Sequence, residues 1–209
     1  MFEDSLYAAT TLKNNGFRFT IIEEQSNLCC TDEIKDGCER YIKSYEVTKI
    51  SILDIVEDTT VDGPGFRTTI YCAGCPNHCP GCHNPRSWDI NNGHDVDIEE
   101  ILEVILADPF ADVTFSGGDP MFQPQGFTEL AVAIKERSSK NIWCYTGYLF
   151  EQILENPAQR TLLEQVDVLV DGRFVEALRD EQLRFRGSSN QRIIDVKRSL
   201  EEGKAVLVM

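Results

Sequence analysis

The chain has 209 residues, 42% of them hydrophobic, and a formal net charge of −15. This length suits one domain of ordinary size with its own core. A surface this acidic repels phosphate backbones, so we expect no nucleic-acid partner. The sequence has no apolar run near the roughly 20 residues of a membrane span. Residues 1–11 are acidic where a secretory signal would be basic, so we expect a cytoplasmic protein without a membrane partner.

Two parts of the chain differ in pattern. Residues 1–46 predict a small helix–strand–helix extension, and the remainder predicts alternating strands and helices. Strands are expected at 50–56, 66–71, 113–115, 141–145, 166–170, 193–196 and 205–209. Helices are expected at 127–137, at 149–154 and after Asp97, a residue suited to cap a helix with Glu100 at its third position. Repeated β–α units predict an α/β fold whose parallel sheet is open or partly rolled into a barrel, with chemistry beyond the carboxyl ends of its strands.

Cysteines are the most informative residues of this chain. Clustered thiols in a chain without a secretory signal suggest metal binding or catalysis rather than disulfides. The eight cysteines are Cys29, Cys30, Cys38, Cys72, Cys75, Cys79, Cys82 and Cys144. Four of them fall within the eleven residues 72–82. We expect the three N-terminal cysteines and Cys144 to be free thiols, the latter in a core strand.

The four clustered cysteines allow two interpretations. All four could bind zinc or a fully ligated iron–sulfur cluster. Alternatively, Cys75, Cys79 and Cys82 supply three thiolates to a [4Fe–4S] cluster, and the fourth iron stays open for a small molecule. The spacing favours the second interpretation, because structural zinc sites usually place a much longer loop between their two cysteine pairs. Cys72 is then a buried thiol at a strand end, and His78 is a loop residue.

Three polar motifs follow predicted strand ends. Gly117-Gly118-Asp119-Pro120 would let the backbone approach a ligand closely, or it is a tight turn in which Asp119 caps a helix. Asp62-Gly63-Pro64-Gly65 is suited to a sharp turn. Asp171-Gly172-Arg173 would face a pocket, or it would form a surface salt bridge. These motifs and the cysteine cluster predict one site.

Several blocks together resemble radical S-adenosylmethionine enzymes that activate glycyl-radical enzymes. They are residues 61–67 (Val-Asp-Gly-Pro-Gly-Phe-Arg), the cysteine loop, and Asn84 followed by Trp88. Residues 143–148, 169–174 and 186–191 are similar in particular to the activating proteins of anaerobic ribonucleotide reductases. The resemblance covers about residues 47–198. It implies an open, partial parallel β/α barrel of the radical S-adenosylmethionine type over residues 47–209.

The resemblance also implies roles for individual residues. The [4Fe–4S] ligands are Cys75, Cys79 and Cys82. The S-adenosylmethionine contacts are Gly81, Cys82, His83, Gly117, Gly118, Asp119 and Asp171. The region that meets the substrate peptide contains Asp62, Gly63 and Arg67. The chain departs from the family at Gly81, where many members carry an aromatic residue, and in having residues 1–46.

The implied reaction is carried by cofactors, with no catalytic side chain. The reduced cluster cleaves S-adenosylmethionine, and the resulting 5′-deoxyadenosyl radical removes hydrogen from a glycine of the anaerobic ribonucleoside-triphosphate reductase. Flavodoxin or ferredoxin is the expected electron donor. The alternatives are an activator of pyruvate formate-lyase, a small-molecule radical enzyme or, in a different class, a non-catalytic iron–sulfur electron carrier or zinc module.

Overall fold

The computed structural model describes residues 48–208. The chain divides into two units, Met1–Glu46 and Val47–Met209, and every element described belongs to the second. The expected N-terminal helix–strand–helix extension lies outside the described residues, as do Cys29, Cys30 and Cys38.

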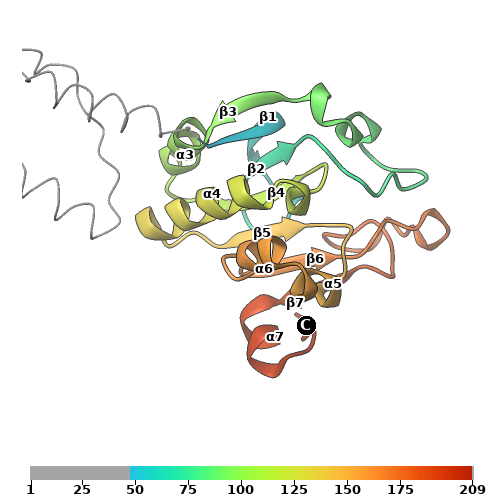
Figure 1. Ribbon diagram of the computed structural model, residues 1–209. Helices are drawn as coiled ribbons and strands as arrows, with labels where there is room; N and C mark the ends of the chain where they lie inside the picture. Colours follow the sequence, from blue (N-terminus) through green and yellow to red (C-terminus); the bar gives the residue numbers. More distant parts are fainter. Residues whose placement is uncertain (1–47, 209) are drawn as a thin grey trace, which may run out of the picture. The chain divides into compact units, whose positions relative to one another are not determined.

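Seven strands form one open sheet in the order β3-β1-β2-β4-β5-β6-β7 (Figure 1). Their bounds are β1 Lys49–Thr59, β2 Arg67–Cys72, β3 His94–Asp97, β4 Asp112–Gly117, β5 Ile142–Tyr145, β6 Val168–Asp171 and β7 Arg192–Asp195. Strands β2, β4, β5 and β6 are parallel, whereas β1, β3 and β7 each join an antiparallel neighbour. The predicted α/β class is confirmed, but the sheet is mixed rather than wholly parallel. The short connection 60–66 can join β1 to β2 only as antiparallel neighbours.

The helices pack against one another beside the parallel strands, α3 on α4, α4 on α6, and α6 on α5 (Figure 1). The α-helices are α3 Ile98–Ala107, α4 Pro124–Arg137, α5 Phe150–Glu155, α6 Pro157–Leu163 and α7 Val196–Glu202. Short 3-10 helices span Pro85–Trp88, Ile90–Asn92, Pro120–Phe122 and Glu176–Leu178. Among residues 48–208, none of the helices has the length and apolar character needed to cross a membrane.

The two faces of the sheet differ because successive side chains of a strand point to opposite sides. One face builds the core with the helices, and its strand residues include Ile70, Cys72, Val113, Phe115, Ile142, Cys144 and Leu169. The expected core position of Cys144 is therefore confirmed. The opposite face carries polar side chains, with Thr69, Tyr71 and Thr114 all hydrogen-bonded to Asp62 of the connection 60–66.

Two local expectations differ from the structure, and two of its elements were not expected. Asp97 lies at the N-cap position of α3 but makes no capping hydrogen bond, and its carboxylate instead pairs with Lys49 at 3.7 Å. The expected strand at 205–209 is reduced, within the described part, to a single bridge between Leu207 and Ile194. Strand β3 and helix α6 were not predicted, although Asn156 and the following proline are helix-start signals.

Candidate functional site

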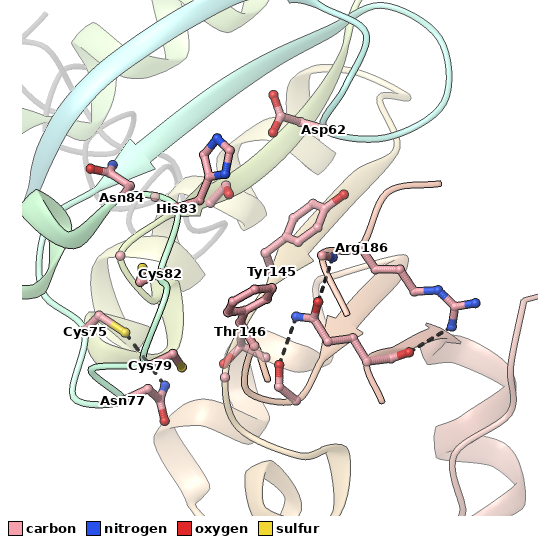
Figure 2. Close-up of a pocket in the computed structure, with 18 of the residues that line it drawn as sticks. Asp62, Cys75, Asn77, Cys79, Cys82, His83, Asn84, Tyr145, Thr146 and Arg186 are labelled. Carbon is pink, nitrogen blue, oxygen red and sulfur yellow. Dashed lines mark hydrogen bonds between the residues drawn. The ribbon is translucent and has the colours of Figure 1, made fainter. Parts of the chain in front are cut away.

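A cavity of about 530 Å³ opens where the parallel strands end. Its wall includes the cysteine loop after β2, Gly117 and Gly118 at the end of β4, residues 145–147 at the end of β5, and parts of the segment 172–191 after β6. The connection 60–66 adds Val61 and Asp62. Figure 2 shows the cysteine loop on one side of this space and Tyr145, Thr146 and Arg186 on the other. The sequence-based expectation of one site beyond the strand ends therefore matches this arrangement.

The four clustered cysteines divide into two kinds. Cys75, Cys79 and Cys82 line the cavity and are half-buried. Cys72 is fully buried and belongs to the helix-covered core. Within residues 48–208, no three His, Cys, Asp or Glu side chains form a group that could hold a metal ion. The donor set that reaches the cavity is nevertheless three soft thiols, the ligand type that iron–sulfur clusters use.

The cysteine loop is held by backbone bonds to the short helix that follows it. Gly74 donates to the carbonyl of Ser87 at 2.8 Å, and Cys75 donates to that of Trp88 at 3.0 Å. The His78 ring stacks on the Trp88 ring with centroids 4.9 Å apart. Trp88 therefore packs against the cysteine loop through His78. His83, in contrast, lines the cavity.

The glycine-rich turn after β4 contributes backbone to the cavity, but its carboxylate does not line it. Asp119 is fully buried and caps the 3-10 helix Pro120–Phe122 through Met121 N at 3.1 Å. It also accepts from Thr146 Oγ1 at 2.8 Å and from Gly147 N at 3.0 Å. Burial raises the pKa of Asp119 to about 6, against the opposing effect of these hydrogen bonds. The capping alternative is thus the one observed.

The Asp171 carboxylate likewise lies away from the cavity. It is fully buried and accepts from Phe150 N at 2.8 Å and from Arg192 Nε at 3.0 Å. Because Asp171 is two residues after Leu169, its side chain points to the same helix-covered side of the sheet. Asp171 thus forms a salt bridge, but with a fully buried carboxylate rather than at the surface, and only Gly172 of this motif lines the cavity.

The residues expected to meet a substrate peptide are only partly brought together. Asp62 lines the cavity and accepts from Tyr71 Oη at 2.7 Å. Arg67 begins β2, at the opposite end of the strand from Cys72, and is fully buried. Its guanidinium donates to Thr114 Oγ1 at 2.6 Å and lies 5.5 Å from the Trp143 ring centroid. Gly63 is buried over this guanidinium, so Gly63 and Arg67 hold the connection 60–66 in place and do not line the cavity.

Sequence reasoning missed two parts of the cavity wall. Asn77, in the cysteine loop, contacts groups from three other strand-end loops. Tyr145 also lines the cavity, and its buried hydroxyl lacks a hydrogen-bond partner among residues 48–208. Asn77 lies between Cys75 and Cys79, and Tyr145 ends β5, but nothing in the local sequence distinguished either residue.

The sequence alone suggested no defined role for the block 186–191. In the structure, this block is hydrogen-bonded to Gly172, directly after β6. Gln191 Nε2 donates to the Gly172 carbonyl at 3.0 Å, and its Oε1 accepts from Gly187 N at 2.8 Å. Arg186 donates to the Gln191 carbonyl at 2.9 Å. These bonds shape one wall of the cavity.

Comparison with known proteins supports an iron–sulfur cofactor for this chain. A family described as "4Fe-4S single cluster domain" matches residues 61–194. The anaerobic ribonucleoside-triphosphate reductase-activating protein of Salmonella typhimurium is 38% identical over 141 residues, covering 63% of this chain and 89% of that protein. The protein of the same name from Escherichia coli K12 is 36% identical over 142 residues, with the same coverage. That of Enterobacteria phage T4 is 35% identical over 140 residues, covering 64% of this chain and 86% of that protein.

The family match includes the whole cysteine loop. The match to the Salmonella typhimurium protein covers most of that protein's length. The chain therefore belongs to the 4Fe-4S single cluster domain family and to the family of anaerobic ribonucleoside-triphosphate reductase-activating proteins.

Proposed function

We propose that this chain activates an anaerobic ribonucleoside-triphosphate reductase in the cytoplasm as a radical S-adenosylmethionine enzyme. The observation that carries the proposal is the division of the cysteines, with three thiols on an open cavity and the fourth in the core. Three protein ligands leave one iron of a [4Fe–4S] cluster for a small molecule. Relatives that match most of their length to this chain bear the name of reductase-activating proteins.

In this proposal the cluster and S-adenosylmethionine, once bound, supply the one-electron chemistry that removes a hydrogen atom from a glycine of the reductase. Cys75, Cys79 and Cys82 hold the cluster. The cavity of about 530 Å³ lies within the range of roughly 300–1,000 Å³ that is usual for small-molecule sites. Four parallel strands end at this cavity, and we propose that their open sheet serves as the partial barrel that the resemblance implies.

The chain's own groups bind and orient the small molecule. Gly81, Gly117 and Gly118, which have no side chains, contribute backbone to the cavity wall, and Cys82 and His83 line the cavity beside Gly81. Tyr145 also lines the cavity, but its hydroxyl is buried and has no hydrogen-bond partner among residues 48–208. Asp119 and Asp171 are positioning residues in this scheme, because their carboxylates hold the strand-end loops from behind.

The substrate peptide would enter beside Asp62. Thr59, Thr69 and Tyr71 all donate to the same oxygen of this carboxylate, Oδ2. The other oxygen, Oδ1, is then suited to accept from a peptide N–H. Flavodoxin or ferredoxin is the proposed electron donor.

The test is direct observation of the product radical on the partner. The full chain with a reconstituted cluster, S-adenosylmethionine and a reductant is mixed anaerobically with the cognate reductase. Electron paramagnetic resonance should show a glycyl radical split by its remaining α-hydrogen, and alanine at the target glycine should erase the signal. A silent reductase, with radical formation on pyruvate formate-lyase instead, would contradict the proposal.

A further inference from the structure

The side chain of Asn77 is the meeting point of the four loops that follow the parallel strands. Asn77 itself lies in the cysteine loop after β2. Its amide contacts Asp119 after β4, Gly147 after β5 and Arg173 after β6. A fourth contact reaches a proposed cluster ligand, because Asn77 Nδ2 lies 3.8 Å from Cys75 Sγ (Figure 2).

The orientation of this amide is determined by the chemistry of its neighbours. Arg173 Nε donates to Asn77 Oδ1 at 2.8 Å, and a guanidinium has no acceptor. Asn77 Nδ2 donates to Asp119 Oδ2 at 3.0 Å, and an ionised carboxylate has no donor. A flipped amide would oppose donor to donor and acceptor to acceptor, so the NH₂ group must face Cys75 and its sulfur.

Gly147 provides the space that the amide occupies. A Cβ atom added to Gly147 would lie 2.2 Å from Asn77 Nδ2 and 2.6 Å from its Cγ. Any larger residue at position 147 therefore displaces the amide from its place beside Cys75. The backbone N–H of Gly147 shares the Asp119 Oδ2 acceptor with Asn77, at 3.0 Å for each.

We propose that Asn77 raises the reduction potential of the cluster by donating a hydrogen bond to the Cys75 sulfur, with Arg173, Asp119 and Gly147 holding its amide in that orientation. The inference rests on the proposed function, since it takes Cys75 as a cluster ligand. Reduction adds negative charge to the cluster and its thiolates, so a donor at the sulfur stabilises the reduced state more than the oxidised state. Asn77 is thus a positioning residue that acts through Cys75.

The test compares midpoint potentials of the full-length, cluster-loaded protein, measured by redox titration with electron paramagnetic resonance detection. Asn77→Ala removes the donor and should lower the potential. The loss of one hydrogen bond to a charged group should lower the ratio of reduced to oxidised cluster roughly tenfold. For a one-electron couple, this corresponds to a midpoint potential about 59 mV lower. Gly147→Ala should shift the potential in the same direction with Asn77 still present. The double variant should shift it no further, because both changes remove the same contact.

Asn92→Ala is the matched control. It deletes an asparagine side-chain donor, Asn92 Nδ2 to the Arg86 carbonyl at 2.9 Å, that lies outside the cavity wall, so the potential should stay unchanged. If Asn77→Ala and Gly147→Ala hold full clusters at the wild-type potential, the inference is wrong while the proposed function stands. If Asn77→Ala loses its cluster, the midpoint potential of Gly147→Ala tests the inference instead. A lower potential supports it, and an unchanged potential contradicts it. A wild-type protein that takes up no cluster would instead overturn the proposed function.

Discussion

Asp171 and Arg192 face each other across the antiparallel pair β6–β7 and form an ion pair on the helix-covered side of the sheet. Asp171 is fully buried, and Arg192 continues outward to Glu151 of α5 at 2.8 Å. The hydrogen bonds to both carboxylates raise the pKa of Arg192, and the bond from Arg192 lowers the pKa of Glu151. This pair ties the last strand to α5 behind the cavity.

Arg192→Met should destabilise the protein strongly. It leaves a buried carboxylate without its cation, which typically costs about 3–5 kcal/mol of unfolding free energy. Urea denaturation would measure the loss, and adding Asp171→Asn to the variant should restore part of it. S-adenosylmethionine affinity should change little in Asp171→Asn. A variant of normal stability that no longer binds S-adenosylmethionine would show that Asp171 contacts the ligand directly.

Gly81→Ala should lower stability for two separable reasons. Gly81 has φ +71°, a left-handed conformation that costs other residues about 1–2 kcal/mol. An added Cβ would also lie 2.9 Å from Glu176 Cδ. Gly65→Ala is the matched control, with φ +74° and nothing within 4 Å of the added Cβ. The loss in Gly81→Ala, measured by thermal unfolding, should exceed that in Gly65→Ala, and Glu176→Ala should remove the difference.

Three of the clustered cysteines should be needed for the cluster and the fourth should not. Cys75→Ala, Cys79→Ala and Cys82→Ala should each lose the intact [4Fe–4S] signal after anaerobic reconstitution, as measured by iron content and absorption. Cys72→Ala should keep it, like the equally buried Cys144→Ala. Cluster loss in Cys72→Ala but not in Cys144→Ala would indicate four-thiolate ligation and an electron carrier.

A chain that begins near Tyr45 should still cleave S-adenosylmethionine. Among residues 48–208, the cavity-lining residues lie between Val61 and Gln191, and the family resemblance begins only at about residue 47. Cleavage would be followed by chromatography of 5′-deoxyadenosine. A shortened chain that is soluble, loaded with cluster and inactive would show that the first 46 residues take part in the chemistry.

The sequence by itself determined the class of fold and the three thiols that line the cavity. Alternating apolar residues such as Ile70 and Val113 predicted strands, and local spacing was sufficient for this because a strand repeats every two residues. The spacing of Cys75, Cys79 and Cys82 predicted a set of thiols that the structure brings to one cavity. Both signals are local in the chain, which is why they can be recognised without coordinates.

Only the tertiary structure decided what the carboxylates and Asn77 do. In the sequence, Asp119 and Asp171 both resembled ligand-binding residues. In the structure, the carboxylate of each accepts hydrogen bonds from residues of other elements. Asn77 had no local signal, because Asp119, Gly147 and Arg173 lie 42 or more residues away in the chain. Parallel strands bring such distant loops together at one edge of the sheet, and which hydrogen bonds then form depends on register and side-chain direction.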